Sequence, residues 1–379
     1  MQELRAFLGR QESLAGHWAL LGPLDCREST RVMERLELTV VQLELTVVQL
    51  EEAKRFIQTD TVPHLRLALL LLDNAAEVLM HRAVQEELAY SDWHREWHAQ
   101  MAAFLRRKPD DDGKTRHRLS QLAARIIPEK RKHKLGKYYN EKVDFLSQEL
   151  HHMSVPVARV LKHIHDYRNE AYHNDRIRPD SIRPAVLILF DVVCTLLATL
   201  RQHAAMSWHA GDSEAWLERY GVSWFGYNAD EIQAAISRAL RLGLPLDTDD
   251  IRAALATHLT SRLDGIDDSI KFIAQNARPH RSGEEVLKAV QYWNTDRDGP
   301  PRGDGDPAFL QFRPQHTLAS IERWRERITA LGGIADKLEL FNLFADIEDD
   351  FEPLERSLNE AAGLIDRAIQ AEIDLLRGK

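Results

Sequence analysis

The stretch HLRLALLLLDNAAEVLMHRAV, residues 64 to 84, decides the fold class. Its apolar residues recur every three or four positions, which is the spacing of one face of an α-helix and differs from the alternation of a strand. The same spacing returns in EIQAAISRALRLGL, residues 231 to 244, and along most of the chain. Runs that alternate like strands between turn signals are almost absent. The sequence therefore predicts an all-α protein.

A heptapeptide, LELTVVQ, occurs twice in succession, at residues 36 to 42 and 43 to 49. Its Leu and Val residues alternate partly like a strand, but the flanking RVMER and LEEAKRFI favour a helix, and a period of seven suits a supercoiled helix. We expect one helix from about residue 28 to 58 that pairs with another helix. Because two copies are fewer than the usual three or four heptads, a duplication tolerated on an ordinary helix explains the repeat equally well.

The chain has 379 residues, of which 44% are hydrophobic and 29% charged, as in a soluble globular protein of two or three domains. Two cysteines, Cys26 and Cys194, are too few for a disulfide framework or a cysteine-rich zinc site, which fits a reducing cytoplasm. The N-terminus lacks the apolar core of a signal peptide. The longest apolar run, residues 185 to 200, contains Asp191 and is shorter than the roughly 20 residues that span a bilayer. We expect a buried helix there, a cytoplasmic protein and no membrane contact.

Charge is distributed unevenly along the chain, whose net charge is -9. Residues 1 to 210 carry 30 Lys and Arg against 28 Asp and Glu, whereas residues 211 to 379 carry 20 against 31. The two halves are therefore expected to meet different partners. The predicted organisation is a helical extension at 1–59, a domain at 60–210 with a basic insertion at 91–137, and an acidic C-terminal helical domain at 211–379.

The segment DYRNEAYHND, residues 166 to 175, carries the candidate catalytic pair. Arg168 and His173 stand five positions apart, and on a continuous helix five residues turn the side-chain direction by about 500°, leaving the two about 140° apart. Either the helix ends between them, or the same pair from a second subunit completes the site. Arg and His also favour the negative end of a helix dipole, so the pair could instead form an ordinary C-terminal cap.

The chemistry of this pair suits RNA cleavage. An arginine binds phosphate through two parallel N–H donors, and an imidazole takes or gives a proton at neutral pH. The nucleophile, the 2'-hydroxyl, belongs to the substrate, so the histidine activates it or protonates the leaving oxygen while the arginine stabilises the charge on phosphorus. Neither a metal ion nor another cofactor is expected.

The motif and its flanking helices together resemble the HEPN family of helical domains. YRNEAYHND ends one helix, SIRPAVLILFDVVCTLLATL follows it and LRLALLLLDNAAEVLMHRAV precedes it. Ribonucleases of that family carry Arg-x4-6-His with a polar residue directly after the arginine, and Arg168, Asn169 and His173 fill these places. The resemblance covers roughly residues 60 to 205. It implies an antiparallel helical bundle in which Asn169 orients the arginine, the histidine or the phosphate.

The resemblance also implies an activity and partners. Active members of the family form dimers that bring both Arg/His pairs into one cleft, cut RNA without metal, and serve as toxins or anti-phage effectors. We therefore expect an endoribonuclease that forms a homodimer and binds RNA; the alternative is a non-catalytic HEPN-like module that binds nucleic acid or protein within a larger complex. Toxins that pair with a nucleotidyltransferase antitoxin carry a tyrosine two places after the histidine, where this chain has Asp175.

A basic stretch at residues 106 to 137 contains 12 Lys and Arg against 4 Asp and Glu, a net charge of +8, and Tyr138 follows it. Such a patch in an acidic protein fits the RNA backbone, and the tyrosine could stack on a base. The alternative is a solvated loop. The residues expected to bind RNA are Arg131, Lys132, Lys134, Lys137 and Tyr138.

Two further groups in the first half of the chain involve spacing on a helix. His94 and His98 have the spacing of metal ligands but lack a third ligand, so we interpret DWHREWHAQ as a packing helix anchored by tryptophans, with partly exposed histidines. Asp73 and Glu77 are either a solvent-facing stripe or a buried pair that needs a cation such as Arg168.

Two histidines lie just before Arg168 on the same expected helix. His165, three residues before it, lies near it, whereas His163, five before it, points elsewhere. The acidic second half has no catalytic signature. It could dock a partner protein, an antitoxin or a subunit of a defence complex, cover the basic patch, or serve as a plain scaffold.

Overall fold

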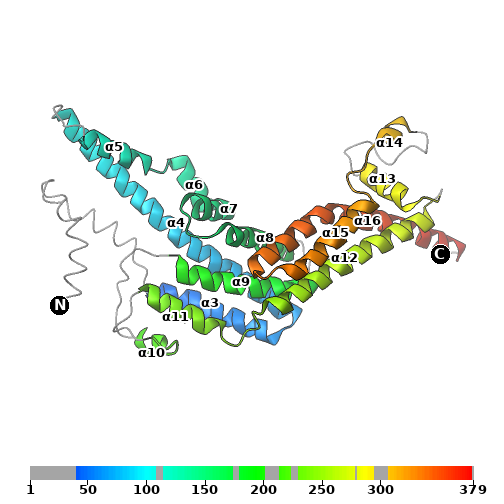
Figure 1. Cartoon of the computed structure of the whole chain (residues 1–379), viewed down its shortest axis with the longest axis horizontal. Coiled ribbons are helices and arrows are strands. Elements are labelled where there is room, and N and C mark those ends of the chain that lie inside the picture. The colour runs from blue at the N-terminus through cyan, green and yellow to red at the C-terminus, as the bar shows by residue number, and fades with distance from the viewer. Residues whose placement is uncertain are drawn as a thin grey trace. The chain divides into compact units, whose positions relative to one another are not determined.

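The computed structural model describes residues 40–107, 114–173, 179–200, 213–222, 229–277, 280–293 and 306–377. All regular secondary structure in these ranges is helical, which confirms the all-α prediction (Figure 1). The helices are α3 (Val40–Thr59), α4 (Val62–Arg107), α5 (Lys114–Ala124), α6 (Glu129–Lys137), α7 (Tyr139–Asp144), α8 (Val155–His173), α9 (Pro179–Thr199), α10 (Ser213–Glu218), α11 (Ala229–Arg241), α12 (Thr248–Asn276), α13 (Gly283–Trp293), α14 (Pro307–Gln311), α15 (Leu318–Ala330) and α16 (Lys337–Leu376), with a π-helical turn at Phe145–Glu149 and a 3-10 turn at Leu331–Gly333.

The chain forms two compact units, each assembled from separate segments. One consists of Met1–Val47, Val78–Lys142 and Leu200–Ala235, and the other of Val48–Glu77, Val143–Thr199 and Ile236–Lys379. Helices α8 and α9 therefore share a unit with α12 and α16, although residue 211 separates them in the predicted organisation. The predicted domains at 1–59, 60–210 and 211–379 stay predictions.

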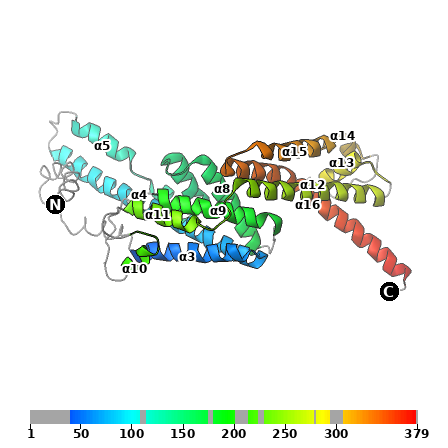
Figure 2. The same ribbon diagram turned by 60° about the horizontal axis from the view of Figure 1, so that its bottom comes forward.

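The second unit is built around two long helices. Helices α12 and α16 lie side by side, with α8, α9 and α15 packed against them (Figures 1 and 2). Leu255, Leu259 and Leu263 of α12 are fully buried, and so are Phe341 and Phe344 of α16. Apolar residues spaced by three or four place one face of each helix in a common core, which explains why the helices pack lengthwise.

Helix α9 is buried, as its apolar sequence predicts. The segment Ser181–Thr199 is long and apolar enough to cross a membrane, but 72% of its most apolar window is buried inside the protein. Asp191, the charge within this run, binds Arg241 Nε and Lys337 Nζ, both at 2.6 Å. Burial by itself would raise the pKa of Asp191, but the hydrogen bonds from Lys337 and Arg241 hold it below its usual value. The aspartate thus ties α9 to α11 and α16.

Two helices are unusually long, at 46 residues for α4 and 40 for α16. Helix α4 continues without a break to Arg107, so the first part of the predicted insertion at 91–137 extends this helix. The stretch contains neither Pro nor Gly, so nothing local stops the helix. Helix α16 begins at Lys337, where Asp336 caps it by accepting from the backbone N–H groups of its first turn.

Helix α3 contains the described part of the duplicated heptapeptide, which confirms a helix there; residues 28 to 39 of the expected helix lie outside the described residues. Leu43, Val47 and Leu50 are buried at spacings of four and three, while Leu45 and Val48 face solvent. The face that carries Leu43, Val47 and Leu50 is therefore already buried against other parts of the same chain. Pairing of this helix with another chain stays a prediction.

Candidate functional site

The candidate site lies on the C-terminal half of α8. Pro156 stands in the first turn of this helix, where a missing N–H costs nothing, and Val160, Leu161 and Ile164 anchor it in the core. Because α8 runs to His173, the helix does not end between Arg168 and His173, and that expectation was wrong. The side chain of His173 lies outside the part that the structure describes. Completion of the pair by a second subunit is the route that a continuous helix leaves open.

Asp73 of α4 joins two residues of α8. The Asp73 side chain is 3% exposed, and its carboxylate oxygens lie 2.9 and 3.1 Å from His165 Nδ1. Arg168 Nε lies 3.4 Å from Asp73 Oδ2, and Arg168 Nη1 donates to Asn169 Oδ1 at 2.9 Å. Asp73 is thus buried and paired with Arg168, and its interpretation as part of a solvent-facing stripe was wrong. Glu77, one turn later, is half-buried.

This cluster fixes both the guanidinium and the imidazole. A buried carboxylate is costly unless cations and hydrogen bonds compensate it, and Arg168 and His165 supply that compensation. The side chains of Arg168 and His165 nevertheless remain 32% and 16% exposed, so solvent reaches part of each. The arrangement holds a guanidinium, which can bind phosphate, next to an imidazole, which can transfer a proton, at an accessible surface.

A second face of α8 contacts α16. Arg159, His163 and Tyr167, spaced by four residues, each meet a carboxylate of α16: Arg159 binds Asp346, His163 Nδ1 lies 3.7 Å from Asp349 Oδ2, and the Tyr167 hydroxyl donates to Glu348. His163 therefore points away from the Asp73 cluster, as its spacing predicted. Polar contacts consequently hold α8 on one side to α4 and on the other to α16.

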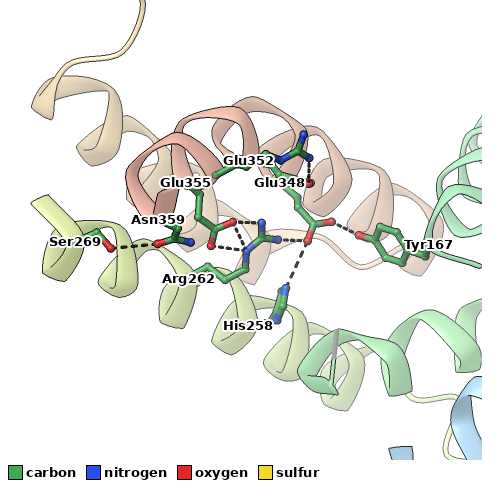
Figure 3. Close-up of polar contacts among 9 residues, drawn as sticks. Tyr167, His258, Arg262, Ser269, Glu348, Glu352, Glu355 and Asn359 are labelled. Atoms are coloured by element: carbon green, nitrogen blue, oxygen red, sulfur yellow. Dashed lines mark hydrogen bonds and ion pairs between the residues drawn. The ribbon is translucent and has the colours of Figure 1, made fainter. Parts of the chain in front are cut away.

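Glu348 of α16 is the centre of the polar contacts between α16 and its neighbours α8 and α12 (Figure 3). It is 1% exposed, accepts from the Tyr167 hydroxyl and from Arg262 Nη1, and lies 3.5 Å from His258 Nε2. Arg262 of α12 also donates through Nε to both oxygens of Glu355, at 3.0 and 3.2 Å. One buried carboxylate therefore links α8, α12 and α16. No sequence pattern indicated this carboxylate.

The predicted RNA-binding residues lie in the other compact unit, on and after α6. Arg131 and Lys134 bind Glu141, and Lys132 binds Asp92. Lys137 Nζ lies 5.3 Å from the ring centroid of Tyr138, whose side chain is exposed. Carboxylates thus offset three of the five residues. Lys137 and Tyr138 keep the exposure that nucleic-acid contact requires.

The helix with two histidines is held by aromatic packing. Trp93 and Trp97 stack with ring centroids 4.9 Å apart, in agreement with the interpretation of this segment as a packing helix. His94 is buried, although partial exposure was expected, and burial lowers its pKa. Among the described residues, no group of three His, Cys, Asp or Glu side chains could hold a metal ion.

A cavity of about 470 Å³ lies at some distance in sequence from the Asp73 cluster, between the segment that follows α14 and helix α16. Phe312, Arg313, His316, Arg356 and Glu360 contribute to its wall. Its lining includes Arg313 and Arg356 as well as Glu360, so the lining charges are mixed in sign. The cluster around Asp73 is the better candidate for chemistry because buried carboxylate, imidazole and guanidinium groups meet there.

Comparison of the chain with protein-family models, with curated proteins and with solved structures finds no match.

Proposed function

We propose that the protein is a metal-independent endoribonuclease that cleaves RNA by attack of the substrate's own 2'-hydroxyl. The observation that carries the proposal is the pairing of the Arg168 guanidinium with the buried Asp73 carboxylate and the Asn169 amide. A guanidinium held in one orientation at an accessible surface is suited to bind a scissile phosphate. The Arg168, Asn169 and His173 pattern of HEPN ribonucleases supports the same reaction.

In this mechanism Arg168 binds the phosphate and stabilises the negative charge that builds on it. His173 transfers a proton, and Asn169 orients the guanidinium by accepting from its Nη1. The 2'-oxygen bonds to phosphorus while the 5'-oxygen leaves, so the products carry a 2',3'-cyclic phosphate and a 5'-hydroxyl. The substrate supplies the nucleophile and the two protein side chains supply charge and protons.

The proposed active form is a homodimer. Arg168 and His173 stand on one continuous helix at positions that diverge by about 140°, so a second copy of α8 would complete each pair. Lys137 and Tyr138 of the other unit would bind RNA as well. A cytoplasmic role as a toxin or anti-phage effector, with the acidic C-terminal half as the surface for a partner protein, follows from the HEPN resemblance and belongs to this proposal.

One observation favours the alternative, a non-catalytic binding module. The ion pair between Arg168 and Asp73 also serves as an interhelical contact, which a protein without catalysis could use for stability alone. In that case replacing His173 would lower the free energy of unfolding by about 1 kcal/mol, as the loss of a helix cap does, and would change no reaction with RNA.

The test uses the purified full-length protein and its Arg168→Ala and His173→Ala variants, incubated with total RNA and transfer RNA in excess chelator. We expect cleavage by the unsubstituted protein only, with fragments that end in 2',3'-cyclic phosphate. A His163→Ala variant is the matched control because His163 lies on the same helix but faces Asp349. Equal cleavage by all variants, or cleavage abolished by the chelator, would contradict the proposal.

A further inference from the structure

The Asp73 cluster contains a histidine that the Arg168/His173 pattern does not include. His165 Nδ1 faces both oxygens of the Asp73 carboxylate at 2.9 and 3.1 Å. A carboxylate accepts hydrogen bonds, so the proton of the neutral imidazole lies on Nδ1 and the lone pair on Nε2. Asp73 therefore selects the ring orientation and the tautomer in which Nε2 can accept a proton.

This pairing has the layout of a histidine base oriented by a buried acid. In such pairs the carboxylate keeps the imidazole in the useful tautomer and stabilises the imidazolium that forms when the ring takes a proton. His165 precedes Arg168 by one helical turn, and both side chains contact Asp73. A phosphate bound by Arg168 would thus lie beside His165.

Resting on the function proposed above, we infer that His165 is the general base of the reaction and Asp73 its positioning residue. Cleavage through the 2'-hydroxyl requires two proton transfers, one from the attacking hydroxyl and one to the leaving oxygen. His165 Nε2 takes the 2'-hydroxyl proton, the 2'-oxygen bonds to phosphorus as the bond to the 5'-oxygen breaks, and His173 gives its proton to that 5'-oxygen. The two histidines end with exchanged protonation states, which solvent resets.

The experiment compares two RNA oligonucleotides of the same sequence, one with the natural 5'-oxygen at the cleaved linkage and one with sulfur in its place. A sulfur leaving group needs no protonation, so it restores a variant that lacks the acid and does not restore one that lacks the base. The variants are His165→Ala, His165→Gln and His173→Ala. His163→Ala is again the matched control, since it removes an imidazole from the other face of α8.

We expect both His165 variants to lower kcat about 100-fold or more on both substrates, with KM little changed. His173→Ala should be slow on natural RNA and recover on the sulfur substrate, and His163→Ala should match the unsubstituted protein. Free imidazole should partly restore His165→Ala. Asp73→Asn should lower kcat and, because Asp73 also holds Arg168, raise KM. His165→Gln keeps an amide N–H that can donate to Asp73. If His165→Ala unfolds, the kcat of His165→Gln tests whether His165 is the general base.

Two results would overturn the assignment of His165 while the proposed function survives. One is cleavage by His165→Gln at close to the normal rate while Arg168→Ala and His173→Ala are inactive. The other is recovery of the His165 variants on the sulfur substrate, which would make His165 the acid. An unsubstituted protein that cuts no RNA removes the proposed function first and this assignment with it.

Discussion

Replacing Arg262 by Met should destabilise the protein more than replacing Glu348 by Gln, although the two side chains form one ion pair. Glu348 is 1% exposed, whereas the Arg262 side chain is 14% exposed and also binds Glu355. Arg262→Met therefore leaves the buried Glu348 carboxylate without its cation. Glu348→Gln, in contrast, leaves Arg262 still paired with Glu355. Removing one partner of a buried pair costs about 3 to 5 kcal/mol when the remaining charge is uncompensated.

We expect Arg262→Met to lie in that range and Glu348→Gln to cost about 1 to 3 kcal/mol, the value of lost hydrogen bonds to a charged group. The combination of both substitutions should be more stable than Arg262→Met alone, because it removes the stranded charge while the methionine still packs on Phe351. Such a rescue by a second substitution has no explanation in packing alone.

The assay is urea unfolding followed by circular dichroism, with the free energy of unfolding taken from transitions of equal slope. Arg356→Met is the matched control: it removes an arginine of α16 whose partner is Glu352 but which is 61% exposed. Exposed pairs contribute about 1 kcal/mol or less, so this variant should stay within that limit. The reasoning fails if Arg262→Met costs no more than Arg356→Met, or if the double variant is no more stable than Arg262→Met.

Further predictions concern buried groups elsewhere in the same unit. Asp191→Asn should lower stability at pH 7: because the folded-state pKa of Asp191 lies below its unfolded value, its contribution is present above about pH 4 and lost as pH falls further, so urea unfolding should show the two proteins converging in acid. Tyr167→Phe, which removes the donor to Glu348, should cost about 1 to 3 kcal/mol by the same measurement. Burial raises the pKa of the Cys194 thiol to about 12, so in a Cys26→Ser background a thiol reagent should react only as the protein unfolds. Phe344→Ala should cost about 3 to 5 kcal/mol because Phe344 is fully buried.

Part of the candidate site could be predicted from short-range patterns. The spacing of His163, His165 and Arg168 on one helix correctly separated the residue that faces away from the two that lie together. The apolar surroundings of Asp73 in its helix offered Arg168 as a partner. The preference of acids for solvent nevertheless favoured an exposed stripe, and only the packing of α8 on α4 shows that Asp73 is 3% exposed.

No spacing pattern in the sequence indicated the network of contacts around Glu348. Glu348 stands in ADIEDDFEPLE, where it looks like one of several solvated acids. Its partners Tyr167 and Arg262 lie 181 and 86 positions away. Likewise, the positive charge of residues 106 to 137 was evident from the sequence. The ion pairs with Asp92 and Glu141 that offset part of this charge were not.

The sequence by itself determined that the chain is helical and that α9 is a core helix, because helical periodicity and apolar content act through neighbours within one or two turns. The tertiary structure decided which charges are buried, which histidine faces Asp73, and that α8 is held between α4 and α16. These outcomes depend on contacts between segments far apart in the chain. Whether a carboxylate loses its contact with water depends on which of those segments pack against it in the folded protein.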